Sequence, residues 1–333
     1  MRDTRFGLLT DAPASFVLVG GRVIDPVDAT DTVRDVAVRD GVVVEAAEDA
    51  ERIDAGGLVV TPGFCDLHTH LREPGSTGAE TIASGSRAAA HGGFTTLCAM
   101  PNTDPPLDSA EAVAPVMSAA ASCRVRVIGA ASRRRAGLEP TDVASLVRAG
   151  AVGVSDDGAA VSNAVVPSLL EQLSAVGLPL FEHAEDAAMA ADGVMRAGET
   201  ASRLGLAPWP AHAEVAIVER DIALAEAAGA RLHLTHLSTA GALDAVRAAR
   251  SRGVAVSCDV TPHHLAMTDA WVGGSRRFSW EEPEPSPRTE LAYDGRCRVN
   301  PPLASRADAL ALLAGLVDGT VDAIATDHAP HPL

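Results

Sequence analysis

From residue 61 onward, short apolar runs alternate with alanine- and leucine-rich stretches. The runs have the length of buried strands, and several of the intervening stretches have the periodicity of helices. Eight runs are present: Gly63–Leu71, Thr95–Met100, Val125–Ala130, Ala151–Ser155, Leu178–Glu182, Leu232–Leu237, Val254–Val260 and Val321–Thr326. Helical patterns fall at Leu138–Arg148, Val165–Val176, Val215–Ala228 and Ala240–Arg252. Eight strand-and-helix units predict an α/β fold of the TIM (β/α)8 barrel type.

Residues 1–60 follow a different pattern. Short strand signals such as Phe16–Val19 and Val42–Val44 are separated by turns that contain glycine and aspartate. We therefore expect a small, sandwich-like antiparallel β-domain over residues 1–60 and the barrel over residues 61–333. Residues 271–298 carry Gly273-Gly274 and several prolines, and they are expected to form a long excursion after the seventh strand.

The composition excludes some classes of partner. The 27 basic and 44 acidic residues give a formal net charge of −17, which disfavours nucleic acid. No run approaches the ~18 apolar residues of a membrane span, and no signal peptide is visible. The five cysteines are scattered without a CxxC pair, as is usual in a reducing cytosol. We expect a cytoplasmic protein that binds neither membrane nor nucleic acid.

Reactive side chains gather at the carboxyl ends of the expected strands, where barrel enzymes build their sites. They follow the first, fourth, fifth, sixth and eighth strands: His68, His70, Asp156, Asp157, His183, His236 and Asp327. A closed barrel brings these strand ends to one point. Six of these side chains are candidate ligands, four imidazoles and the carboxylates of Asp157 and Asp327. This set suits two metal ions with a bridging oxygen, since one zinc ion needs three protein ligands and water. Such a pair supplies hydroxide at neutral pH, and a nearby carboxylate can move its proton to a leaving nitrogen.

Seven motifs in consistent order over residues 16–333 carry a family resemblance. They are Asp66–Gly75 (DLHTHLREPG), Ala99–Pro106 (AMPNTDPP), Ser155–Gly158 (SDDG), Glu182–Asp186 (EHAED), Thr261–Leu265 (TPHHL), Val299–Leu303 (VNPPL) and Ala325–His331 (ATDHAPH). Together they resemble the type I dihydroorotases of the amidohydrolase superfamily. Many relatives bridge their two metals with a carbamylated lysine after the fourth strand. All 27 basic residues of this chain are arginine, so it has no lysine for that role.

The resemblance instead places an aspartate between the metals. Asp157 matches that position, and Asp156 is the neighbouring alternative. The resemblance further implies two zinc ions per chain, with Asp327 as both ligand and catalytic acid/base. The implied ligands are His68, His70 and Asp327 for one ion, and His183 and His236 for the other. The residues that match the family's substrate contacts are Arg72, Asn102, Asn300 and His331.

The implied reaction is the reversible cyclisation of N-carbamoyl-L-aspartate to L-dihydroorotate in de novo pyrimidine biosynthesis. An arginine fork and an amide suit the carboxylate of that small substrate. Two alternatives stay open: another cyclic amidase, similar to hydantoinase or allantoinase, and a non-catalytic scaffold for aspartate transcarbamoylase. A homodimer and an association with aspartate transcarbamoylase also stay open.

Two features depart from the family pattern. Ala304 stands where the family tends to show arginine, and the chain ends at Leu333, directly after the eighth expected strand. Because the family continues past this point, we expect a C-terminal truncation that removes the last barrel helix and the C-terminal part of the small domain. Such a chain is expected to be poorly soluble or weakly active.

Overall fold

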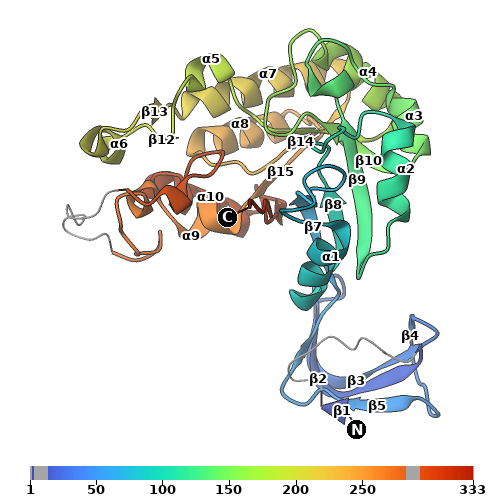
Figure 1. Ribbon diagram of the computed structural model, residues 1–333. Coiled ribbons are helices and arrows are strands. Elements are labelled where there is room, and N and C mark those ends of the chain that lie inside the picture. Colours follow the sequence, from blue (N-terminus) through green and yellow to red (C-terminus); the bar gives the residue numbers. More distant parts are fainter. Residues whose placement is uncertain (1, 4–13, 283–292, 333) are drawn as a thin grey trace.

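Eight parallel strands form the largest sheet of the protein (Figure 1), in a computed structural model that describes residues 2–3, 14–282 and 293–332. The strands lie in the order β16-β15-β14-β11-β10-β9-β8-β7. They are β7 (Phe64–Thr69), β8 (Phe94–Ala99), β9 (Arg124–Ala130), β10 (Ala151–Ser155), β11 (Pro179–Glu182), β14 (Arg231–Leu234), β15 (Val256–Val260) and β16 (Ala323–Ile324). The predicted (β/α)8 barrel is confirmed.

The last strand is much shorter than the sequence pattern predicts. The apolar run Val321–Thr326 contributes only the two residues of β16, which pair with β15. The circle is closed instead by an isolated parallel bridge between Thr69 and His328, and His70 N donates to His328 O over 2.8 Å. The first and last units of the barrel therefore meet next to the histidines of the first strand.

Helices cover the outside of the barrel (Figure 1). They include α1 (Ile82–His91), α2 (Ala110–Ser118), α3 (Val143–Arg148), α4 (Val166–Val176), α7 (His212–Ala228), α8 (Ala240–Ser251) and α10 (Arg306–Asp318). Helix α3 begins five residues later than the pattern predicts, because the Asp142 side chain caps it by accepting from Ser145 N. Within residues 325–332 the structure describes no helix.

Two apolar layers hold the barrel together. A large core fills the space between strands and helices, with fully buried Leu146, Leu173 and Leu243 among its members. A smaller cluster fills the inside of the barrel: Leu67, Cys98, Met100, Ile128, Val152 and Phe181. This inner plug lies below the carboxyl ends of the strands, so the site above it opens only toward the loops.

The N-terminal residues form a six-stranded sheet that Figure 1 shows beside the barrel rather than within it. Its strands are β1 (Arg2–Asp3), β2 (Phe16–Asp25), β3 (Thr30–Arg39), β4 (Val42–Val44), β5 (Glu51–Asp54) and β6 (Val59–Val60). The expectation of an antiparallel sheet is wrong in part, because β5 and β6 both run parallel to β2. A register shift between Leu18 and Gly21 lets the two halves of β2 take these different partners. The domain boundary near residue 60 stays a prediction.

Short elements lie over the carboxyl end of the barrel. They are α5 (Ala187–Ala190), β12 (Met195–Arg196), α6 (Glu199–Leu204), β13 (Pro208–Trp209), α9 (Pro262–Ala266) and the 3-10 turns η1 (Arg133–Arg135), η2 (Asp269–Trp271) and η3 (Gly295–Cys297). Of the predicted excursion, residues 283–292 lie outside the described part of the chain. Residues 293–298 return toward the barrel, and Arg296 and Arg298 face the cavity described below.

Candidate metal centre

Asp157 lies at the centre of a cluster of imidazole rings. Its Oδ1 is 3.3 Å from His68 Nε2 and 3.7 Å from both His183 Nδ1 and His236 Nε2. Its Oδ2 is 3.5 Å from His70 Nε2. Four rings from three different strand ends thus face one buried carboxylate.

Asp327 adds a second carboxylate on the side of the first strand. Its Oδ1 is 3.1 Å from His70 Nε2 and 3.5 Å from His68 Nε2. Ligand atoms within 4.8 Å of one another form two groups, one of His68, Asp157 and His236 and one of His68, His70 and Asp327. Because His68 belongs to both groups, the described residues offer two adjoining places for a cation.

Contacts at the far side of two rings decide which nitrogen faces the centre. His70 Nδ1 lies 2.8 Å from Asn102 Oδ1, and His183 Nε2 lies 3.0 Å from Glu185 Oε2. Both oxygens are acceptors, so each of these ring nitrogens carries a hydrogen. The lone pairs of the neutral rings are therefore His70 Nε2 and His183 Nδ1, which both point inward.

This donor set fits a metal cation better than it fits a closed set of hydrogen bonds. His68 Nε2 and His70 Nε2 are 3.3 Å apart, and His183 Nδ1 and His236 Nε2 are 3.0 Å apart. Two lone pairs cannot bond to each other, so each pair needs a proton or a metal ion between its members. Imidazole and carboxylate ligands of this kind suit Zn²⁺.

The electrostatics of the metal-free centre point the same way. Burial alone would raise the pKa of Asp157, but the surrounding rings, with His68 foremost, hold it well below the usual range. Burial alone would lower the pKa of His68, but Asp157 and Asp327 raise it to about 9. The pKa of His183 is likewise raised to about 9 by Asp157 and Glu185. Without metal, the centre thus recruits positive charge in the form of protons.

Asp156 faces away from this centre. Its Oδ1 accepts from Ser132 N over 3.0 Å, and its Oδ2 accepts from the Ser132 hydroxyl. Burial is the main reason that the pKa of Asp156 is raised. Neighbouring residues at a strand end point in opposite directions, so only one of the two aspartates can face the imidazoles. In this structure that residue is Asp157.

The backbone is strained at three of the predicted site residues. Arg72, His236 and Asp327 have φ angles of 58°, 38° and 51°, in the left-handed region that residues other than glycine rarely adopt. At His236, a hydrogen bond of 2.7 Å from its backbone N to Asp259 Oδ1 holds this conformation. Such strain persists only where surrounding contacts enforce it, and it collects at functional sites.

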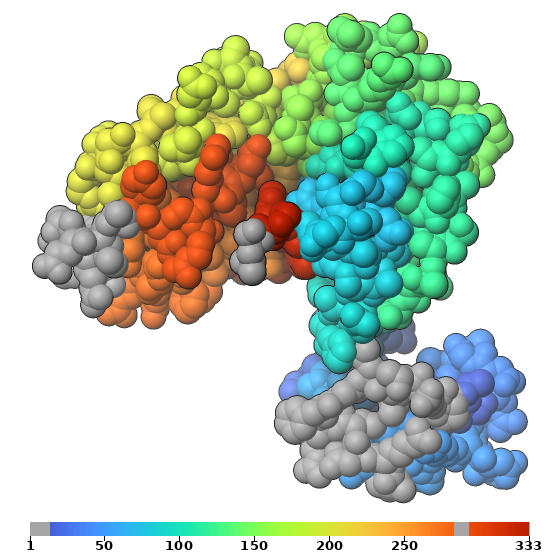
Figure 2. Space-filling view, in the orientation of Figure 1, coloured from blue at the N-terminus to red at the C-terminus, as the bar shows by residue number. Residues whose placement is uncertain are grey.

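A cavity of about 590 Å³ opens directly above the centre. All four predicted substrate contacts line it: Arg72, Asn102, Asn300 and His331. Five of the six predicted ligands also line it: His70, Asp157, His183, His236 and Asp327. His68 lies underneath and is almost fully buried. In Figure 2 the red residues of the last segment, which includes Asp327, lie between the cyan and orange surfaces.

Comparison with known proteins shows the origin of this arrangement. A family model described as "Dihydro-orotase-like" matches residues 57–242. A protein named dihydroorotase from Anaeromyxobacter sp. (strain K) is 49% identical over 322 residues, which cover 94% of this chain and 71% of that protein. The chain belongs to the dihydroorotase family. A second dihydroorotase, from Geobacter sp. (strain M21), is 43% identical over 327 residues, which cover 95% of this chain and 73% of that protein.

Solved structures of similar fold are more distant in sequence. L-hydantoinase (dihydropyrimidinase) from Arthrobacter aurescens has a TM-score of 0.77 at 24% identity and covers 95% of this chain and 70% of its own. Dihydropyrimidinase from Brevibacillus agri NCHU1002 has a TM-score of 0.74 at 23% identity, and the match covers 96% of this chain and 69% of that protein. These likenesses support the barrel fold. With its dihydroorotase relatives, the chain is a cyclic amide hydrolase.

Several residues around the dihydroorotase-family centre are missed by sequence reasoning. Glu185 contacts a predicted ligand, and the cavity is also lined by Trp209, Arg296 and Arg298. Glu185 lies within the EHAED motif, which is the sequence signal that could have found it. The others come from β13 and the return of the excursion, so only the folded chain brings them to the strand ends.

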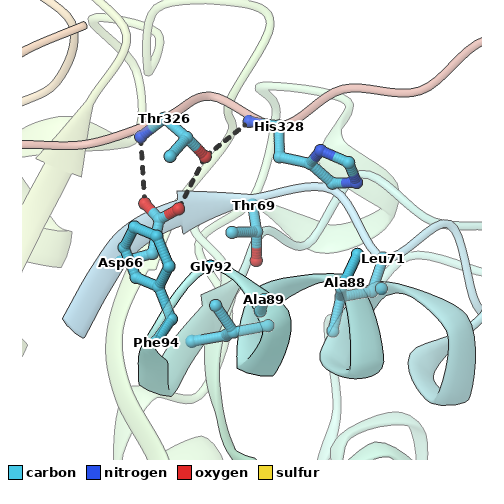
Figure 3. Close-up of a pocket in the computed structure, with 11 residues that line it drawn as sticks. Asp66, Thr69, Leu71, Ala88, Ala89, Gly92, Phe94, Thr326 and His328 are labelled. Atoms are coloured by element: carbon cyan, nitrogen blue, oxygen red, sulfur yellow. Dashed lines mark hydrogen bonds between the residues drawn. The ribbon is translucent and has the colours of Figure 1, made fainter. Parts of the chain in front are cut away.

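A second cavity, of about 290 Å³, lies on the helix side of β7 (Figure 3). Its walls are mostly apolar, with Leu71, Ala89 and Phe94 from the first unit. Figure 3 also shows Asp66 accepting from Thr326 at its edge. The cavity lies behind the strand that carries the histidines, and it holds none of the predicted ligands.

Among the described residues, no helix has the length and apolar character to cross a bilayer.

Proposed function

We propose that this dihydroorotase-family chain cyclises N-carbamoyl-L-aspartate to L-dihydroorotate and catalyses the reverse hydrolysis, in de novo pyrimidine biosynthesis. The observation that carries the proposal is the convergence of four imidazoles and two carboxylates at one centre, with Arg72 in the cavity above it. The imidazoles and carboxylates suit metal ions, and the guanidinium suits the carboxylate that both reactants carry.

Two zinc ions are the proposed cofactors. His68, His70 and Asp327 would hold one, His183 and His236 the other, and Asp157 would lie between them. When bound, the two cations would polarise the reacting carbonyl group and lower the pKa of water to supply hydroxide at neutral pH. The position of Asp157 among all four rings supports its bridging role over Asp156.

Asp327 is the proposed catalytic acid/base. In hydrolysis it takes the proton of the attacking water, and it gives that proton to the ring nitrogen as the amide bond breaks. In cyclisation it removes the proton from the attacking ureido nitrogen. Its left-handed backbone and its position at the cavity wall support this role.

Four residues are proposed to bind the substrate: Arg72, Asn102, Asn300 and His331. Arg72 uses Nε to donate to Pro330 O over 3.1 Å, which leaves its terminal nitrogens for a carboxylate. Asn102 Nδ2 also donates to Asp157 Oδ2 over 3.1 Å, so its amide lies between the substrate pocket and the centre. An uncharged hydantoin would leave the guanidinium unpaired.

The test is dihydroorotate hydrolysis by the purified protein, with metal content measured on the same sample. We expect turnover, up to two zinc ions per chain and no dependence on bicarbonate. A strict bicarbonate requirement would contradict the aspartate bridge. Faster hydrolysis of uncharged hydantoin than of dihydroorotate would favour the alternative of another cyclic amidase.

We also propose a cytoplasmic location, which the five free cysteines of the chain support. A homodimer and an association with aspartate transcarbamoylase are proposed from the family resemblance. Light scattering of the purified protein, alone and mixed with that enzyme, tests both.

A further inference from the structure

One carboxylate oxygen of Glu185 accepts two hydrogen bonds from residues that line the cavity. Glu185 Oε2 lies 3.0 Å from His183 Nε2 and 3.1 Å from Asn300 Nδ2. His183 follows β11, whereas Asn300 lies more than a hundred residues further along the chain, after the return of the excursion. Glu185 therefore joins a predicted metal ligand directly to a predicted substrate contact.

The first hydrogen bond explains an asymmetry of the centre. His68, His70 and His236 all approach Asp157 through Nε2, whereas His183 approaches it through Nδ1. An ionised carboxylate has no hydrogen to give, so His183 must donate to Glu185 from Nε2. The neutral ring then has its lone pair on Nδ1, which faces the centre.

The second hydrogen bond fixes the direction of an amide. Because Glu185 only accepts, Asn300 must turn its NH2 group toward it. The carbonyl oxygen Oδ1 of Asn300 then points away from Glu185 and has no hydrogen-bond partner within residues 14–282 and 293–332. Asn300 lines the cavity, so it offers an acceptor there that suits an N–H group better than it suits a carboxylate.

We propose that Glu185 is a positioning residue with two effects: it selects Nδ1 of His183 as the metal-binding atom, and it orients Asn300 to accept a hydrogen bond from the substrate's ureido or ring N–H. The second effect rests on the proposed function, which supplies that N–H. The first effect does not, because it concerns only the hold on the metal.

Metal retention tests the first effect. The zinc-loaded protein is mixed with a chromophoric chelator, and zinc release is followed in Glu185→Ala, Glu185→Gln and the control Glu171→Gln, which changes an exposed residue of α4. We expect release from Glu185→Ala to be on the order of 10-fold faster than from the parent, as is usual when the partner of a ligating histidine is removed. Glu185→Gln should be less affected, since its carbonyl oxygen can still accept from His183. The control should match the parent.

Steady-state kinetics with dihydroorotate test the second effect. Asn300→Ala should raise KM roughly 3-fold to 10-fold, with metal release unchanged, as the loss of one hydrogen bond predicts. Glu185→Ala should raise KM similarly. Glu185 affects KM only through Asn300 in this proposal. The double variant Glu185→Ala/Asn300→Ala should therefore have the KM of Asn300→Ala within about twofold.

Two results would overturn the proposal: metal release from Glu185→Ala at the parent rate, or KM effects that multiply in the double variant. If circular dichroism shows that Glu185→Ala does not fold, Glu185→Met decides, because it keeps the length of the side chain and removes both oxygens. Zinc release from Glu185→Met at the parent rate together with an unchanged KM overturns the proposal. A parent protein that binds zinc but does not hydrolyse dihydroorotate would refute the proposed function and the second effect, while zinc release would still decide the first.

Discussion

The carboxylate of Asp66 accepts from both the backbone N and the hydroxyl of Thr326, a residue 260 positions later in the chain. Asp66 Oδ1 also accepts from His68 N over 3.2 Å. One buried side chain thus ties the strand that carries His68 to the segment that carries Asp327. Since β16 has only two residues, this tie supplies contacts that strand pairing would otherwise provide.

Asp66→Asn should destabilise the protein. The backbone N and the hydroxyl of Thr326 donate to different oxygens of Asp66. Asparagine replaces one of these oxygens by an NH2 group, which can only donate, so both hydrogen bonds cannot be kept in their present geometry. We expect the free energy of unfolding to fall by about 1–3 kcal/mol, the usual cost of leaving a buried polar group without its partner. Urea denaturation measures this change, with exposed Asp28→Asn as the matched control. Equal midpoints for the two variants would mean that the tie adds nothing to closure of the barrel.

The two neighbouring aspartates should differ in what their loss does. Asp157→Ala removes the carboxylate that faces four imidazoles, so we expect zinc content to fall sharply. Asp156→Ala should leave zinc content close to the parent and lower thermal stability, because Ser132 loses its acceptor. Metal analysis and thermal unfolding of both variants check this. The reverse pattern would assign the bridge to Asp156.

Stability of the metal-free protein should depend on pH in a defined direction. Despite burial, Asp157 and its neighbours raise the pKa of His68 and of His183 from 6.5 to about 9. The stabilisation from the protonated rings is complete below pH 6.5 and is lost as the pH rises through 9. We expect the free energy of unfolding of chelator-treated protein to be lower at pH 9 than at pH 6 by at least about 1 kcal/mol.

Acid should act in the opposite sense on the same cluster. Burial opposes ionisation of Asp327, but His70 and the other rings hold the pKa of this carboxyl well below 3.8. The stabilisation that ionised Asp327 contributes is present above pH 3.8 and is lost as the pH falls further.

The control for the loss of stability at alkaline pH is metal-free Asp157→Ala, because the imidazoles of this variant lack their main partner. An equally steep alkaline loss in that variant would contradict the assignment.

Asp327→Asn should reduce turnover strongly. Loss of a group that both takes and returns a proton costs at least ~100-fold in kcat, or about 3 kcal/mol. The assay contains saturating zinc, because Asp327 is also a proposed metal ligand and loss of zinc from the variant would lower kcat in the same way as loss of the base. Exposed Asp192→Asn is the control and should keep the parent kcat. A kcat for Asp327→Asn within threefold of the parent would remove Asp327 from proton transfer.

Arg72→Lys should chiefly weaken substrate binding. A lysine cannot donate to Pro330 O and hold a carboxylate through a planar fork at the same time. We expect KM for dihydroorotate to rise about 10-fold, with a smaller change in kcat. Exposed Arg34→Lys is the control. Any slow hydrolysis of uncharged hydantoin should be insensitive to Arg72→Lys. An equal loss of activity with both substrates would show that Arg72 is not the residue that binds the substrate carboxylate.

Much of the barrel could be predicted from the sequence because its signals are local. The buried runs are continuous and apolar, and helices α4, α7 and α8 lie within a few residues of their predicted bounds. Local signals fail where tertiary contacts decide. The run Val321–Thr326 predicts a full strand, yet β16 is cut to two residues because the chain then turns toward Asp66 and His70. Strands β5 and β6 pair in parallel with β2, which requires the chain to cross over the sheet, and the hydrophobic pattern of the strands does not predict such a connection.

The candidate site divides in the same way. The six predicted ligands follow strand ends, so barrel geometry alone brings them together. Their orientation could not be predicted: the choice between Asp156 and Asp157 depends on which one Ser132 engages. Glu185 and Arg298 were missed because their relevance arises from His183 and from the return of the excursion, each fixed only in the folded chain.

The separation of 257 positions between His70 and Asp327 has a consequence for biosynthesis on the ribosome. His68, His70 and Asp157 are translated well before Asp327 leaves the exit tunnel. A nascent chain that captures zinc at that stage would hold it without the carboxylate that we propose moves the proton. The centre would therefore acquire affinity for metal before it acquires the capacity for turnover, and arrival of the last segment would convert a zinc-binding intermediate into an enzyme.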